Sequence, residues 1–143
     1  MLLFNCNKPR SPRFLLEPFA DALKKQQLRL DHVIFCVPKV MDIAVDQSNV
    51  LAQANYTNTS WQKQIADEWN ALIADWPGQH PNVHIMSSVN LAYEFFCNLT
   101  KEPKDSDTPQ LPGSRSSVEV LVTGSLYLVG AILQVVHYPT VQD

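Results

Sequence analysis

The amino-acid sequence predicts an α/β fold with a mainly parallel sheet and helices on both faces. Four short runs are almost continuously apolar rather than alternating, which is typical of strands covered on both faces. They are residues 2–5, 32–37, 83–86 and 118–122. Helical patterns lie between them, and this alternation favours a parallel, Rossmann-like sheet with right-handed crossovers. The 143 residues are 45% hydrophobic and 17% charged, so we expect one packed domain over residues 1–143.

A loop and then a helix are expected after the first strand. Ser11 and Pro12 form a good helix start, because serine is a preferred N-cap and proline is favoured at the first helical position. An apolar stripe then continues to Leu23, with basic residues after it, as suits a helix C-terminus. Pro18 interrupts the stripe, so we expect either a kink at this residue or a helix that starts near it.

The second strand ends before Pro38, and two helical segments are expected before the third strand. The first is residues 46–56. The second begins at Thr59, which forms a capping box with Gln62 if each side chain bonds the other's backbone N–H. Its apolar residues recur at steps of three and four and include Trp61 and Trp69. We interpret these tryptophans as core packing rather than as a platform for stacked bases.

The remaining elements are a helix, a loop, the fourth strand and a last helix. An apolar helix follows Ser87 and Ser88 and extends through Phe96. Residues 101–117 are rich in proline, serine and charge, and we expect a mobile surface loop there. The last helix spans 126 to about 136, directly after the fourth strand and a short turn.

The loops after the four strands are the predicted ligand site, because ligands of parallel sheets bind beyond the carboxyl ends of the strands. These loops carry Asn7, Lys8, Arg10, Lys39, Ser87, Ser88, Thr123, Gly124 and Ser125. In the turn of Thr123, Gly124 and Ser125, the glycine permits a tight bend and a close backbone approach. The serine is suited to capping the last helix, and the same N–H groups can attract a carboxylate or phosphate. Both interpretations stay open on these residues alone.

Several classes of function are disfavoured by composition. The net charge is −3 and no basic run exceeds two residues, so we expect no nucleic-acid partner. No apolar stretch reaches the ~20 residues of a membrane helix, so we expect no membrane insertion. The cysteines and histidines show no metal-type spacing, and no catalytic Ser/His/Asp or Cys/His set can be assembled. We therefore predict no metal site and no catalytic residue within the chain, and interpret the three cysteines as buried thiols of a reducing compartment.

Three stretches, in this order, resemble a known family. "LLFNCNKPRSP", "DHVIFCVPKV" and "VEVLVTGSLYLVGAILQVV" are together similar to the C-terminal domain of eukaryotic folylpolyglutamate synthases, in the Mur ligase superfamily. The last stretch resembles the family signature VTGSLHLVG, with Tyr127 at the usual histidine position. The first resembles the family's FN…RD segment through Arg10, with Ser11 where the family has aspartate.

The resemblance implies an ATP-dependent amide ligase of one-carbon metabolism. In that family ATP phosphorylates the terminal carboxylate of a reduced folate, and the amino group of L-glutamate attacks the acyl phosphate. ATP, magnesium and a potassium ion are bound mainly by an N-terminal domain with a P-loop, which this sequence lacks. The resemblance also implies a cytoplasmic or mitochondrial monomer. Thr123, Gly124 and Ser125 would lie on the glutamate side of the cleft.

The sequence opens abruptly with an apolar strand, so we expect a fragment that lacks the first strand of this domain. Alone, such a fragment is expected to be inactive. Two other interpretations remain at this point. One is a non-catalytic binding or regulatory α/β module from a truncated paralogue. The other is a different Rossmann-like nucleotide domain. The sequence has no GxGxxG after any predicted strand, which argues against this alternative.

Overall fold

A computed structural model describes residues 1–41, 58–101 and 117–137 of the chain. Its sheet has four strands in the order β3-β2-β1-β4, and each neighbouring pair is parallel. The strands are β1 (Leu2–Phe4), β2 (His32–Cys36), β3 (Asn82–Met86) and β4 (Leu121–Thr123). The helices are α1 (Pro12–Lys25), α3 (Ser60–Ile73), α4 (Val89–Thr100) and α5 (Leu126–His137). The predicted parallel α/β fold is therefore confirmed.

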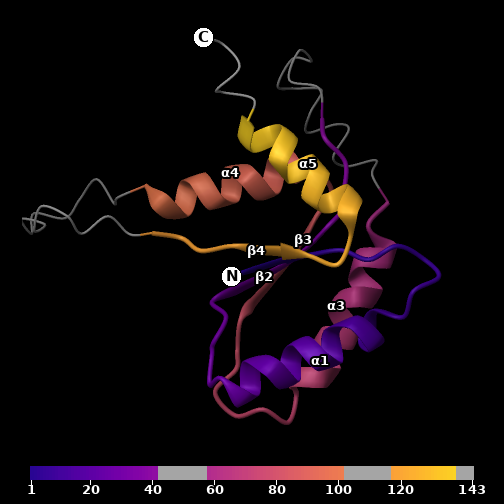
Figure 1. Cartoon of the computed structure of the whole chain (residues 1–143), viewed down its shortest axis with the longest axis vertical. Coiled ribbons are helices and arrows are strands. Elements are labelled where there is room, and N and C mark those ends of the chain that lie inside the picture. The colour runs from indigo at the N-terminus through magenta and orange to yellow at the C-terminus, as the bar shows by residue number, and fades with distance from the viewer. Residues whose placement is uncertain (42–57, 102–116, 138–143) are drawn as a thin grey trace, which may run out of the picture.

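Helices cover both faces of the sheet, α1 and α3 on one side and α4 and α5 on the other (Figure 1). The alternation of side chains along the central strands explains this arrangement. Leu2 and Phe4 of β1 pack into the cluster with α1 and α3, whereas Leu3 between them packs with α4 and α5. The central strands β1 and β2 thus have two buried faces, as their continuous apolar runs predict.

The two outer strands are less buried than the sequence predicts. Ile85 of β3 and Leu121 of β4 are exposed, in contrast to the buried residues of β1 and β2. The fourth strand also begins at Leu121 rather than at residue 118. The reason is the strand order: among the described residues β3 and β4 each pair with one neighbour, and an apolar run does not reveal whether its strand lies at the centre or at an edge.

Helix α1 runs without interruption through Pro18, so the expectation of a helix that starts near this residue is wrong. Proline removes one N–H donor, which leaves the carbonyl of Phe14, four residues earlier, without its helical partner. Phe14 and Pro18 both lie on the exposed side of α1, where water can take the place of that partner. The helix begins as predicted with proline at its start, although the side chain of Ser11 makes no capping bond.

The predicted capping box at the start of α3 is also wrong. The side chain of Thr59 makes no capping bond, and Gln62 instead reaches the sheet. Asn58, which precedes the N-cap Thr59, satisfies one N–H of the first turn, because its side-chain oxygen accepts a hydrogen bond from the backbone N–H of Ser60 at 2.9 Å. The predicted helical segment 46–56 and almost all of the predicted loop 101–117 lie outside the described residues.

Candidate functional site

The strand order places a topological switch point between β1 and β4. From β1 the chain passes to α1 on one face, and from β4 it passes to α5 on the other face. Where two neighbouring parallel strands connect to opposite faces, their loops diverge and leave a crevice at the carboxyl edge of the sheet. The two loops concerned are residues 5–11 and the Thr123–Ser125 turn, both among the predicted site segments.

Gly124 brings the β4 turn against the end of β1. Its φ is +97°, in the region that residues with a Cβ rarely adopt. A Cβ added to Gly124 would collide with the carbonyl oxygen of Asn5 and with the ring of Phe4. The tight bend and the close backbone approach predicted for this glycine are thus both present, and they hold the two loops side by side.

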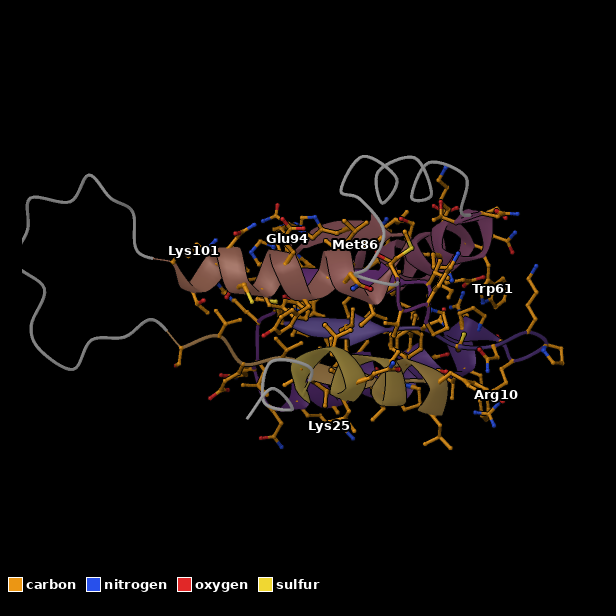
Figure 2. The ribbon with its side chains drawn as sticks, turned by 90° about the horizontal axis from the view of Figure 1, so that it is seen from above. Arg10, Lys25, Trp61, Met86, Glu94 and Lys101 are labelled. Atoms are coloured by element: carbon orange, nitrogen blue, oxygen red, sulfur yellow. The ribbon has the colours of Figure 1, made fainter. Side chains whose placement is uncertain are left out.

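A pocket of about 520 Å³ lies between these loops. It is lined from the β1 side by Asn7, Lys8, Pro9, Arg10 and Leu15, and from the β4 side by Val122, Thr123, Gly124, Ser125, Leu126, Tyr127 and Val129. All three residues of the predicted turn therefore line one pocket together with the two basic residues of the first loop. The pocket lies at the end of the molecule where Figure 2 labels Arg10.

The pocket is suited to an anion. Among the described residues that line it, Lys8, Arg10 and Tyr127 are ionisable and none is acidic. The positive field of Arg10 extends to the buried thiol of Cys6, whose pKa is raised by burial and partly lowered again by this guanidinium. The first backbone N–H groups of α5 add the positive end of a helix to the same wall.

Ser125 does not cap α5 through its side chain, so that expectation is wrong. Its backbone carbonyl accepts the N–H of Val129 at 3.1 Å, which is the ordinary helical bond. Its hydroxyl oxygen is screened from solvent and has no hydrogen-bond partner in the described part of the chain. An unpaired buried hydroxyl is destabilising, roughly by 1–3 kcal/mol, and rotation of the side chain would let it bond a ligand in the pocket.

Replacing Ser125 by alanine is expected to leave the stability of the ligand-free chain unchanged or slightly raised, because no hydrogen bond is lost. Ser88 is the matched control: its hydroxyl caps α4 by accepting the N–H of Leu91 at 3.3 Å. Ser88→Ala should lower the free energy of unfolding by about 1 kcal/mol. Urea denaturation of the three chains makes the comparison. An equal loss in both variants would mean that Ser125 is a helix cap.

The other predicted rim residues lie beyond β2 and β3 and do not line this pocket. Ser88 is buried and serves as the N-cap of α4. The carbonyl of Lys39 accepts the N–H of Val89 at 2.9 Å and so joins the end of β2 to the same helix. Ser87 likewise does not line the pocket. The four loops share one rim as predicted, and among the described residues the pocket lies at its β1–β4 part.

Two residues of α3 contribute to the site and were not predicted to do so. The indole Nε1 of Trp61 donates to the carbonyl of Cys6 at 2.6 Å, and its ring lies under Lys8, with Nζ 5.0 Å from the ring centroid. The neighbouring Gln62 donates from Nε2 to the side-chain oxygen of Asn5 at 3.1 Å. In the sequence Trp61 belongs to an apolar helical stripe, and nothing there distinguishes it from a core tryptophan.

Two of the four histidines, His32 and His84, form a separate cluster on the α4 side of the sheet. Nδ1 of His32 and Nε2 of His84 are 3.1 Å apart, and both rings pack against Phe95 of α4. Burial lowers the pKa of His84 below its ordinary value, and the neighbouring His32 lowers it further. Because the two rings share one hydrogen bond, one nitrogen must act as the acceptor and remain unprotonated.

The fold should therefore lose stability in mild acid. In the unfolded chain His84 takes up a proton near pH 6.5, whereas in the folded chain its lowered pKa delays uptake. The contribution is complete above pH 6.5 and is lost as the pH falls towards the folded pKa. Urea midpoints between pH 7.5 and 5 should fall more steeply for the wild type than for His84→Gln. Parallel curves would contradict this assignment.

Burial also raises the thiol pKa of two of the three cysteines, Cys6 and Cys36. Cys6 and Cys36 are buried as predicted, whereas Cys97 is only partly buried. Burial raises the pKa of the Cys36 thiol to about 12, so it stays protonated and unreactive at neutral pH.

Within residues 1–41, 58–101 and 117–137, no group of three or more His, Cys, Asp or Glu side chains is placed to hold a metal ion. None of the helices in this part of the chain is long and apolar enough to cross a membrane. Comparisons with models of protein families, with curated proteins and with solved structures give no match.

Proposed function

We propose that this chain is the C-terminal domain of an ATP-dependent amide ligase of the folylpolyglutamate synthase type. In this proposal the pocket between β1 and β4 binds a carboxylate of L-glutamate. The observation that carries it is the position of the Thr123–Ser125 turn. This turn is the part of the sequence most similar to that family, and it lines a basic pocket at the switch point of the sheet.

The residues of the pocket support carboxylate binding in two ways. Ser125 has a hydroxyl without a partner, and rotation about its single side-chain torsion can direct this donor to a bound oxygen. Lys8 and Arg10 face the same space from the opposite loop and offer charge to a carboxylate. Glutamate carries two carboxylates and one amine, so a pocket that holds a carboxylate leaves the amine free to point outwards.

The free amine is the nucleophile of the proposed reaction. Its nitrogen forms a bond to the carbonyl carbon of a folate acyl phosphate, phosphate leaves with the electrons of the broken C–O bond, and the amine loses a proton. This chain's part is to bind glutamate and orient it. On the resemblance to folylpolyglutamate synthases, we assign ATP, magnesium and potassium mainly to a separate N-terminal ATPase domain.

Titration of the 143-residue chain with L-glutamate tests this proposal. NMR shifts are expected at residues 123–127, together with saturable binding. Ser125→Ala should weaken binding about ten- to a hundredfold, because one hydrogen bond to a charged group is lost. Ser87→Ala is the matched control, since this rim serine does not line the pocket. A folded chain without any glutamate-dependent shifts would contradict the proposal.

A second measurement separates the ligase from a non-catalytic module. The purified chain should not incorporate labelled glutamate into folate, with or without ATP. Addition of the ATPase domain of a folylpolyglutamate synthase should restore incorporation, and Ser125→Ala should reduce the restored rate. Glutamate binding without any restored incorporation would favour the binding module over the ligase.

A further inference from the structure

We infer that Trp61 is a positioning residue of the pocket: it holds Lys8 and the start of the β1–α1 loop where an anion is bound. This inference rests on the proposed carboxylate pocket. It assigns a role to Trp61, which does not line the pocket but contacts residues of its β1 side. It makes α3 part of the site, although α3 packs on the face of the sheet opposite to α5.

Trp61 contacts the loop at two points with different chemistry. Its Nε1 donates to the carbonyl of Cys6 at 2.6 Å, which fixes the backbone directly after β1. Two residues later, Nζ of Lys8 lies 5.0 Å from the centroid of the same indole, within the range of a cation–π interaction. Figure 2 shows Trp61 and Arg10 at the same end of the molecule, opposite to Lys101.

The first turn of α3 reinforces this attachment. Gln62 follows Trp61 and donates to the side chain of Asn5 at 3.1 Å, and both residues are buried. The loop then closes on itself, because the N–H of Arg10 donates to the carbonyl of Asn7 at 3.0 Å. The sequence from Asn5 to Arg10 is thus held at successive points, and each basic side chain leaves the loop from a fixed backbone.

The consequence concerns Lys8, which is otherwise an exposed lysine. A free lysine side chain samples many rotamers, and this freedom is lost when it binds an anion. The indole restricts Lys8 before the anion arrives, so less freedom is lost on binding. Trp61 also packs against the core of the α1–α3 side, so a test must separate positioning from simple stability.

A double-mutant cycle with Lys8 makes this separation. Trp61→Leu removes the ring and the N–H, and it should raise the Kd for L-glutamate about three- to tenfold in the wild-type background. In the Lys8→Met background the same change should raise the Kd less than about twofold, because Trp61 acts through Lys8. Trp61→Phe keeps a ring beneath Lys8 and should recover part of the affinity. Trp76→Leu, at a tryptophan remote from this pocket, is the matched control.

Two results would overturn the inference: an unchanged Kd for Trp61→Leu, or the same rise in Kd with and without Lys8. The second would show that Trp61 does not act on the bound anion through Lys8. In either case glutamate binding by the wild-type chain would leave the proposed function intact.

A ligand-free measurement keeps the inference testable if the wild-type chain binds no glutamate. The backbone amide of Arg10 is hydrogen-bonded within the loop, so its hydrogen exchange reports the order of the loop. Trp61→Leu should accelerate this exchange about tenfold or more relative to the amides of β2, whereas Trp76→Leu should not. Equal exchange rates in wild type and Trp61→Leu would show that Trp61 does not hold the loop.

Discussion

Gly124→Ala is expected to lower the free energy of unfolding by about 2–6 kcal/mol. Two effects combine: a residue with a Cβ is strained at φ +97°, roughly by 1–3 kcal/mol, and overpacking against β1 adds roughly 1–3 kcal/mol. The atoms in the way are the carbonyl of Asn5 and the ring of Phe4, and neither is the flexible end of a long side chain. A loss of this size is a large part of the stability of an ordinary domain.

Gly130→Ala is the matched control for this prediction. Gly130 lies within α5, and a Cβ there would meet no atom within 4 Å. Alanine at this helical position should raise the free energy of unfolding by about 0.5–1 kcal/mol. Thermal and urea denaturation of both variants make the measurement. If Gly124→Ala were as stable as the wild type, the close approach of the β4 turn to β1 would be wrong.

Trp69→Ala should have an effect of similar size, a loss of about 3–5 kcal/mol in the free energy of unfolding. Trp69 is fully buried between α3 and the sheet and packs on Phe19 of α1, with ring centroids 6.4 Å apart. Its removal would leave a cavity within the cluster that joins α1 and α3 to β1 and β2. Alanine at Trp76, which is only partly buried, should cause a much smaller loss.

Trp69→Phe distinguishes the loss of packing volume from the loss of a hydrogen bond. The indole N–H of Trp69 is buried and has no partner among the described residues, so phenylalanine loses volume but no bond. This variant should therefore retain most of the stability that alanine loses. Urea midpoints give the comparison, and equal losses for phenylalanine and alanine would mean that the indole N–H has a partner.

Most of the fold can be predicted from the sequence, because local patterns of apolar residues determine which segments form strands and helices. The continuous apolar runs of β1 and β2 predict strands with two buried faces, and the intervening helical stripes predict a parallel sheet. The order of the strands in the sheet cannot be predicted in this way. β3 and β4 are outer strands because α4 carries the chain across to the far side of β1, and no local pattern encodes that step.

The candidate site likewise contains residues that could be predicted from the sequence and residues that could not. Gly124 was predictable, since a glycine between an apolar strand and an apolar helix indicates a tight turn. The hydroxyl of Ser125 was not, because a cap and an unpaired donor differ only in one torsion angle. Trp61 was not predictable either, since its contacts with Cys6 and Lys8 join residues about fifty positions apart in the chain.

The pairing of β1 with β4 has a consequence for biosynthesis. The backbone N–H of Leu121 donates to the carbonyl of Met1 at 3.0 Å, and the pocket lies beyond the far end of the same strand pair. On the ribosome, β1, β2 and β3 can assemble early, but the anion pocket has no second wall until β4 and the turn after it have emerged. On the proposed function, glutamate would bind only to a nascent chain that has completed the β1–β4 pairing, and by mass action it would stabilise this paired state.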